Sequence, residues 1–316
     1  MNNLAPIAIF AYNRPSHLKK CLVALKRNVL SANSCVYVFI DKVKDEDDIE
    51  NMDKNLKVIE VAKMENWCKE CTIIIREKNY GIEKNIIEGV SDLVNKYGKV
   101  IVIEDDLVVS NSFLEYMNNG LEYYQNIDVV KQVVGFNLLE SVQSNHDAIL
   151  LPIASSWGWG TWDRVWSQVD FLDKSSLSKI ESYLFDLEGA FPYYKLLKNQ
   201  ISKNNTNTWD VQFWKYVLKS KGLVLYPKKN LVLNSGFDGS GVHYIKEVFQ
   251  KQQVFSNDSY QYFPSQIKFE INHFNSLKNK LLSFQVSSRL AFLNYLCYYL
   301  KKIWYYKYSF VKYYKN

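Results

Sequence analysis

Three acidic residues directly follow an apolar strand pattern at residues 100–106, which read Val-Ile-Val-Ile-Glu-Asp-Asp. Adjacent carboxylates repel one another, so a cluster of this kind is stabilised by a neutralising cation. In extended backbone Glu104 and Asp106 point the same way, so two carboxylates can converge on one site. Oxygen ligands favour Mg²⁺ or Mn²⁺ over zinc. The ordinary alternative is a solvated acidic turn at the end of a strand.

The chain on both sides of this stretch alternates between strand and helix patterns. Apolar runs at 6–11, 35–40, 72–76 and 100–103 predict four strands. Helical spacing predicts one helix that starts at Pro15, a second that ends near residue 63 and a third over residues 82–97. Ser112 with Glu115 has the pattern of a capping box that starts a further helix. This order predicts an α/β fold with a mostly parallel sheet flanked by helices. Ligands in such folds bind beyond the carboxyl ends of the strands, where the three acids stand.

After residue 131 the alternation is less regular. Strands are predicted at 132–136, 149–153 and 223–226, and helices at 178–198 and 209–219. A segment rich in Trp and Gly at 155–162 predicts a loop that exposes ring faces, and tryptophans that fill the core are the ordinary alternative. From about residue 275 the pattern becomes a basic, aromatic helical tail.

Composition limits the class of protein. The 316 residues are 47% hydrophobic with only 12 Gly and 6 Pro, which excludes a disordered or collagen-like chain. Five irregularly spaced cysteines do not form a disulfide framework and indicate a reducing compartment. The apolar start has no basic segment before it, so we interpret it as a buried strand and not as a signal peptide. No uncharged apolar run is long enough to span a bilayer, so we expect a cytoplasmic protein.

The positive charge is concentrated in the tail. The formal net charge is +6, yet residues 271–316 hold eight basic residues and no acidic one. Leucines, Trp304 and many tyrosines alternate with these lysines, a pattern typical of helices that lie on an anionic membrane surface. The pattern also suits single-stranded nucleic acid, and a helix packed on the body with a solvated lysine face is the ordinary alternative. We favour a peripheral position on the inner face of the cell membrane and expect no nucleic-acid partner.

The ends of the predicted strands carry a recognisable set of motifs. Residues 9–14 read Ile-Phe-Ala-Tyr-Asn-Arg, the strand at 35–40 is followed by Asp41, and the acids at 104–106 are followed by Leu107 and a helix rich in Phe and Tyr. On these motifs the chain resembles glycosyltransferases of the GT-A fold, and more narrowly the N-acetylglucosaminyltransferase I family and bacterial family 2-like sugar transferases. The resemblance implies that Asp106 binds Mn²⁺ (or Mg²⁺) that bridges the diphosphate of a nucleotide-sugar. It also implies that Asp41 holds the nucleoside and that Arg14, Glu104 and Asp105 lie against the donor. The ordinary alternatives are a surface position for Arg14 and the cap of a turn for Asp41.

Later motifs extend the resemblance to about residue 245. Trp157-Gly158-Trp159 matches a family segment that lines the donor sugar and the acceptor, which puts Trp159 at the sugar. Asn79-Tyr80-Gly81 resembles the Asn-x-Gly turn of many such enzymes, which assigns Asn79 to the nucleotide. Trp209-Asp210 matches the pair whose aspartate is the catalytic base, although Val211 stands where the family has a second acid. Neighbouring rings predict a raised pKa for Asp210, and a first-turn acid of a helix is the ordinary alternative.

These motifs lead to one expected activity. We expect a metal-dependent, inverting hexosyltransferase domain over 1–245, with a nucleotide-binding half to about 135 and an acceptor half from 136, followed by an extension over 246–316. The expected donor is a UDP-sugar, and the expected acceptor is a glycan or lipid-linked oligosaccharide of a bacterial surface polysaccharide. A nucleotidyltransferase acting on sugar phosphates is one alternative, although it normally has a phosphate loop rich in Gly, Arg and Lys after the first strand. A catalytically inactive nucleotide-binding scaffold of the same fold is another.

Overall fold

The computed structural model describes residues 4–203, 209–238, 258–285 and 309–315. Its strands are β1 Ile7–Ala11, β2 Cys35–Ile40, β3 Glu70–Ile75, β4 Lys99–Glu104, β5 Leu107–Val109, β6 Val130–Val134, β7 Ala148–Leu151, β8 Trp159–Trp162, β9 Leu223–Pro227 and β10 Val232–Asn234. Its α-helices are α1 Pro15–Lys26, α2 Ile49–Lys63, α3 Gly81–Tyr97, α4 Phe113–Tyr123, α5 Asp163–Trp166, α6 Lys179–Phe185, α7 Tyr193–Lys203, α8 Trp209–Lys219, α9 Ile271–Gln285 and α11 Phe310–Lys315. Two 3₁₀ segments, η1 Val29–Asn33 and η2 Gly236–Asp238, complete the described elements.

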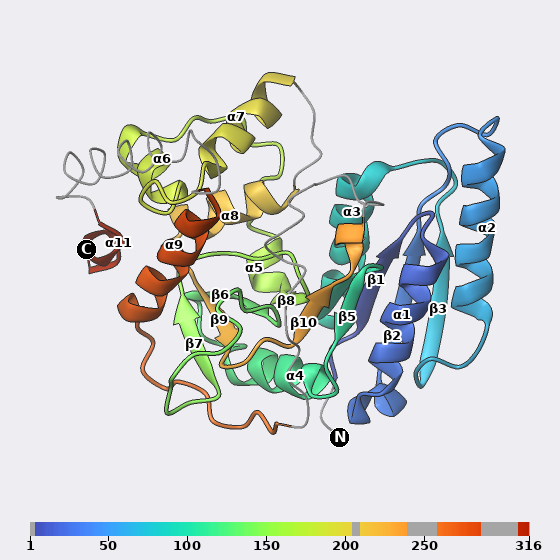
Figure 1. Cartoon of the computed structure of the whole chain (residues 1–316), viewed down its shortest axis with the longest axis horizontal. Helices are drawn as coiled ribbons and strands as arrows, with labels where there is room; N and C mark the ends of the chain where they lie inside the picture. Colours follow the sequence, from blue (N-terminus) through green and yellow to red (C-terminus); the bar gives the residue numbers. More distant parts are fainter. Residues whose placement is uncertain (1–3, 204–208, 239–257, 286–308, 316) are drawn as a thin grey trace.

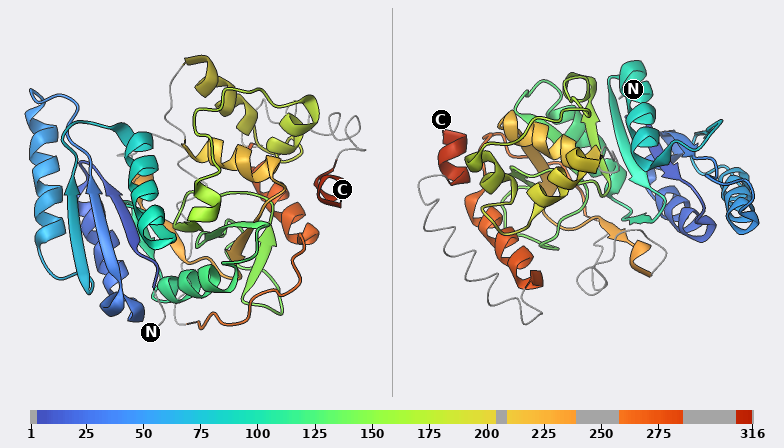
Figure 2. Two further views of the ribbon diagram at one scale, coloured as in Figure 1. Left: turned by 180° about the vertical axis from the view of Figure 1, so that it is seen from behind. Right: turned by 90° about the horizontal axis from the view of Figure 1, so that it is seen from above.

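Eight of these strands form one sheet, in the order β3-β2-β1-β4-β8-β6-β9-β7 (Figure 1). Four of its seven strand pairings are parallel. Helices flank the sheet on both sides in the two views of Figure 2, so the predicted α/β class with a mostly parallel sheet is confirmed. Right-handed crossovers account for α1 and α2 on one face of β1–β3 and α3 on the other.

Strand β8 joins the two halves of the chain into one sheet. It runs antiparallel between β4 and β6, with Trp159 opposite both Val102 and Val134. The sequence predicts a ring-exposing loop here, and that prediction is wrong for 159–162. A side chain at position 160 would put its Cβ 2.8 Å from the Val100 carbonyl oxygen, so glycine allows the close approach of the strands.

A two-stranded sheet lies beyond the end of β4. β5 pairs antiparallel with β10, so that Leu107 stands opposite Asn234 and Val109 opposite Val232. Figure 1 shows this pair beside β1 and α1. The pairing brings the segment that follows β10 to the three acids at the end of β4.

The predicted helix at 178–198 is two helices, α6 and α7. Leu187, Glu188 and Gly189 between them have φ values of 53°, 59° and 88°, which an α-helix does not tolerate. Ser178 with Glu181 forms the capping box that starts α6. Ser112 also precedes a helix, α4, but its side chain makes no capping hydrogen bond, so the capping box predicted there is wrong.

The described parts of the tail pack on the body of the protein. Phe274 of α9 and Phe310 of α11 are fully buried, with ring centroids 4.7 Å apart. Lys278 forms a buried ion pair with Glu188, and Lys280 pairs with Glu140. The tail has no acidic residue of its own, but folding gives two of its basic residues acidic partners, because both glutamates come from loops far away in the sequence.

The remaining expectations about the tail concern other residues. Arg289, Lys301, Lys302 and Lys307 lie outside the described residues, and the membrane-surface role of this segment stays a prediction. In the described part of the chain, no helix combines the length and the apolar character needed to cross a bilayer.

Candidate functional site

The acid cluster consists of Glu104, Asp105 and Asp106, and its two aspartates form an ion-pair network with Arg14. β1 lies parallel to β4 with Phe10 opposite Glu104, so the turn after β1 runs beside the acids. Arg14 Nη1 donates a 2.9 Å hydrogen bond to Oδ2 of Asp106. Its Nη2 and Nε donate to the two carboxylate oxygens of Asp105. The structure thus brings together four of the residues that the sequence assigns to the donor site.

Burial and the repulsion between neighbouring carboxylates change the pKa values of this cluster. Burial raises the pKa of Asp105 to about 7, although the charge of Arg14 acts in the opposite direction. Burial, followed by the charges of Asp106 and Asp105, raises the pKa of Glu104 well above its ordinary value. Burial acts to lower the pKa of Arg14, but the two aspartates outweigh it and raise this pKa, so Arg14 stays a cation.

The segment that follows β10 covers Asp106. The backbone N–H and the hydroxyl of Ser235 both donate to the Asp106 carbonyl oxygen at 2.8 Å. At Gly236 a Cβ would lie 2.4 Å from Oδ2 of Asp106, so this carboxylate leaves room only for glycine. Ser235 and Gly236 therefore lie directly against Asp106, at the edge of the acid cluster.

His17 supports this covering segment, and sequence reasoning did not identify it. Its buried ring places Nε2 3.3 Å from the Ser235 carbonyl oxygen and 3.1 Å from Oδ2 of Asp238. In the sequence His17 stands only in the first turn of a predicted helix, one of four histidines in the chain. His17 and Ser235 become neighbours through the pairing of β10 with β5, which brings the segment after β10 to α1.

Asp41 and Asn79 meet at the carboxyl end of β2. Asp41 is 5% exposed, and its carboxylate accepts hydrogen bonds of 2.8 Å from the backbone N–H groups of Tyr80 and Gly81. The Asn79 side-chain amide donates to the same carboxylate at 3.3 Å. Asp41 therefore ties the start of α3 to β2, as an acid at a helix N-terminus does. Their contact with a nucleoside stays a prediction.

A cavity of about 240 Å³, here named the aromatic pocket, contains Asp210 in its wall. Most of its wall is aromatic or aliphatic, contributed by Phe136, Leu138, Trp157, Phe191, Tyr193, Trp209, Phe213, Trp214 and Leu281. The polar side chains in the wall include Ser155, Ser156 and Asp210. Asp210 lies in the first turn of α8. Its charge adds to the burial that raises the pKa of Tyr193, another residue of the pocket wall.

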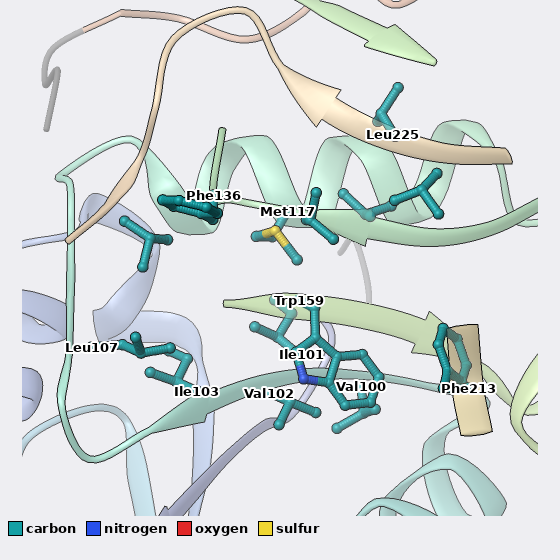
Figure 3. Close-up of a cluster of buried hydrophobic side chains, with 14 of the residues drawn as sticks. Val100, Ile101, Val102, Ile103, Leu107, Met117, Phe136, Trp159, Phe213 and Leu225 are labelled. Carbon is teal, nitrogen blue, oxygen red and sulfur yellow. The ribbon is translucent and has the colours of Figure 1, made fainter. Parts of the chain in front are cut away.

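Trp159 does not line a ligand site, which corrects its expected place at the sugar. Its side chain is 0% exposed and stacks on Trp209 at a centroid distance of 4.9 Å. Figure 3 shows the indole among Val100, Ile101, Val102 and Phe213. The reason is the strand position: the pleat of β8 turns Trp159 into the core.

Its neighbour Trp157, two positions earlier, lies outside that strand and lines the aromatic pocket. The Trp157 ring contacts the ring of Phe136 in the pocket wall, at a centroid distance of 4.5 Å, and the ring of Phe237 of η2, at 5.6 Å. Trp157 therefore connects the pocket to the segment that covers Asp106.

The carboxylate oxygens of the acid cluster suit a cation that is bound partly by the protein and partly by phosphate. Among the described residues no group of three or more His, Cys, Asp or Glu side chains could hold a metal ion. The Asp106 side chain is 14% exposed and offers carboxylate oxygens at the edge of the cluster. Mg²⁺ and similar ions are commonly held by one or two carboxylates together with substrate phosphates. Asp106 is suited to that arrangement, and not to a cage built by the protein alone.

Sequence comparison finds no matching protein family and no matching curated protein. Among solved structures, TarS of S. aureus is similar at 11% identity, with a TM-score of 0.39, over 72% of this chain and 36% of that chain. The mannosyltransferase PcManGT from Pyrobaculum calidifontis, in complex with GDP-Man and Mn²⁺, is similar at 9% identity, with a TM-score of 0.37, over 70% of this chain and 78% of that one. An apo UDP-glucose pyrophosphorylase is similar at 10% identity, with a TM-score of 0.39, over 74% of this chain and 94% of that one. These likenesses are remote and assign no family to the chain.

Proposed function

We propose that this protein is a glycosyltransferase that moves a sugar from a nucleotide-sugar to a hydroxyl of a glycan acceptor with inversion. The observation that carries the proposal is the meeting of a cationic and acidic cluster at the carboxyl ends of β1 and β4 with an aromatic pocket that contains an aspartate. Arg14 and Asp106 form the first part, and Asp210 belongs to the second. Trp157 lines the pocket and contacts Phe237, and the preceding residue Gly236 lies against Asp106, which supports a single site made of both parts.

The acid cluster suits the diphosphate of a donor. A divalent cation held by Asp106 would neutralise the charge that develops on the leaving diphosphate. Arg14 lies beside Asp106 and carries a guanidinium that pairs with phosphate oxygens in two parallel hydrogen bonds. Ser235 and Gly236 cover Asp106 and limit the access of water from that side. UDP is the proposed nucleotide, and a hexose is the proposed sugar.

Asp210 suits the role of general base. In the transfer, an acceptor hydroxyl oxygen attacks the anomeric carbon of the donor and forms the new C–O bond. The bond from that carbon to the phosphate oxygen breaks, and the nucleoside diphosphate leaves with the electron pair. The hydroxyl proton passes to the Asp210 carboxylate, which must be ionised and within hydrogen-bond reach. Attack from the face opposite the diphosphate inverts the anomeric configuration.

Calorimetry tests the donor half of this proposal. Wild-type protein titrated with UDP in Mn²⁺, and again in EDTA, should bind in Mn²⁺ and bind much more weakly in EDTA. Release of UDP from a panel of UDP-hexoses, with and without glycan acceptors, then tests transfer. No binding of UDP or GDP in Mn²⁺ would rule the proposal out. Formation of pyrophosphate from a nucleoside triphosphate and a sugar phosphate would instead support the nucleotidyltransferase alternative.

A further inference from the structure

The aromatic pocket has one wall from the C-terminal part of the chain. Leu281 of α9 lines it, together with Trp209, Asp210 and Trp214 of α8, and Figure 1 shows α9 on the same side of the molecule as α8. Leu281 is only 7% exposed. The sequence assigned α9 to a membrane-binding tail and gave no reason to connect it with Asp210.

Two lysines of α9 hold the loops that carry other parts of the same wall. Lys278 pairs with Glu188, which precedes the pocket residue Phe191, and both members of the pair are buried. Lys280 pairs at 3.0 Å with Glu140, which follows the pocket residue Leu138.

Both glutamates are in the left-handed backbone region, with φ values of 65° for Glu140 and 59° for Glu188. Residues other than glycine occupy that region only when their surroundings hold them there. α9 therefore fixes two loops of the pocket as well as contributing a side chain.

The size and the chemistry of the aromatic pocket suit a small ring-shaped ligand. Its volume of about 240 Å³ is below the range of pockets that take drug-sized ligands. A pyranose offers an apolar C–H face that packs on aromatic rings and hydroxyls at its edge. Trp157 and Trp209 provide ring surface in the wall, and Ser155, Ser156 and Asp210 provide polar groups.

We infer that the aromatic pocket binds a single terminal pyranose of the acceptor and that α9 is its selectivity wall, with Leu281 limiting the depth available to the sugar. The inference rests on the proposed function, since it assigns the acceptor class to the same site. It gives the C-terminal segment a role in acceptor choice that is independent of donor binding.

The test compares Leu281→Trp, which fills the pocket, Leu281→Ala, which deepens it, and Asn279→Ala, an exposed substitution on the same helix as the control. The probes are methyl glycosides of glucose, galactose, mannose and N-acetylglucosamine and their p-nitrophenyl counterparts. Binding is followed by tryptophan fluorescence and by saturation-transfer NMR. Wild type and Asn279→Ala should bind at least one methyl glycoside, and Leu281→Trp should weaken that binding at least tenfold. Leu281→Ala should gain affinity for the larger p-nitrophenyl glycoside.

UDP binding in Mn²⁺ and thermal melting are measured in parallel on every variant. UDP affinity should stay within about twofold of wild type in all three. If Leu281→Trp does not fold, Leu281→Ala decides the question through its gain for the larger probe. Failure of wild type to bind any glycoside, or equal binding by both folded Leu281 variants, would overturn the inference. Leu281-dependent glycoside binding without UDP binding would retain the pocket and reject the proposed donor.

Discussion

Arg14 and Asp106 are 2.9 Å apart, joined by a hydrogen bond from Nη1 to Oδ2 between the ends of two neighbouring strands. The same guanidinium also binds Asp105, so one cation neutralises two of the three acids. A phosphate-bound cation that approached Asp106 would compete with this pair, and Arg14 would then be available to the phosphate. This exchange of partners is the basis of the first prediction.

Asp106→Ala should remove the metal-dependent part of UDP binding. A charge-assisted contact contributes about 1.5–3 kcal/mol, so the affinity for UDP in Mn²⁺ should fall about tenfold or more. The fold should persist because Arg14 keeps its contact with the more buried Asp105. Calorimetry measures the affinity, and Asp92→Ala, an exposed acid of α3, is the control. An unchanged affinity in Asp106→Ala would show that another residue holds the cation.

Asp210→Asn should separate donor binding from transfer. The amide keeps the size of the side chain but cannot take the acceptor proton, so the transfer rate should fall about 100-fold or more. UDP affinity in Mn²⁺ should match that of wild type, because the change is in the aromatic pocket and not in the acid cluster. Transfer near the wild-type rate in this variant would assign the base to a different residue.

Glu188→Ala should destabilise the protein strongly. Lys278 and Glu188 are both buried, and the second oxygen of Glu188 accepts a 2.9 Å hydrogen bond from the Phe310 backbone N–H. Removing one member of a buried pair leaves an uncompensated charge, which costs about 3–5 kcal/mol of unfolding free energy. Urea unfolding measures this. The control is Lys280→Ala, whose partner Glu140 is partly exposed, and its loss should not exceed about 1 kcal/mol. Equal losses in the two variants would contradict the assignment.

Trp159→Phe and Trp159→Ala test the corrected place of this residue in the core. Its indole N–H has no hydrogen-bond partner among the described residues, so the Phe variant loses packing but no polar contact. The Ala variant should lose about 3–5 kcal/mol of unfolding free energy and the Phe variant less. UDP affinity of the folded Phe variant should equal that of wild type. A selective loss of UDP binding at unchanged stability would return Trp159 to the donor site.

Asp173 should contribute stability that depends on pH. Its carboxylate lies 2.8 Å from Nζ of Lys215, whose side chain is almost fully buried. Partial burial acts to raise the pKa of Asp173, but hydrogen bonds from Lys215 and Ser175 outweigh it and lower the pKa to about 2. A lowered pKa in the folded state stabilises the protein above the unfolded pKa of about 3.9, and this contribution disappears as pH falls through about 2.

Asp173→Asn should therefore lower the unfolding free energy at pH 7 by about 1 kcal/mol, a value reduced for the partial exposure of the carboxylate. The difference between variant and wild type should shrink between pH 4 and pH 2. Urea midpoints at pH 7, 4 and 3 measure it. A difference that stays constant over this range would mean that Asp173 acts through its shape and not through its charge.

The sequence alone determined the elements whose signal is local. Apolar runs with turn residues between them predicted β1 to β4, because strands of a parallel sheet between two layers of helices are continuously hydrophobic, although the edge strand β3 is only partly buried. The helical spacing of apolar residues predicted α1 to α3. The acid cluster could be placed at a strand end for the same reason. Its pairing with Arg14 could be expected in outline, since carboxyl ends of parallel strands meet at one edge.

Only the tertiary structure decided which side chains are buried together. Trp157 and Trp159 look alike in the sequence, and only the antiparallel insertion of β8 sends one to a pocket and the other to the core. The tail lysines look unpaired along the chain, but folding brings Glu188 and Glu140 to α9. These contacts depend on strand register and loop closure over long sequence separations, which hydrophobic periodicity does not specify. The fold class can therefore be predicted from the sequence, whereas the wall of the pocket around Asp210 forms only when segments far apart in the sequence pack together.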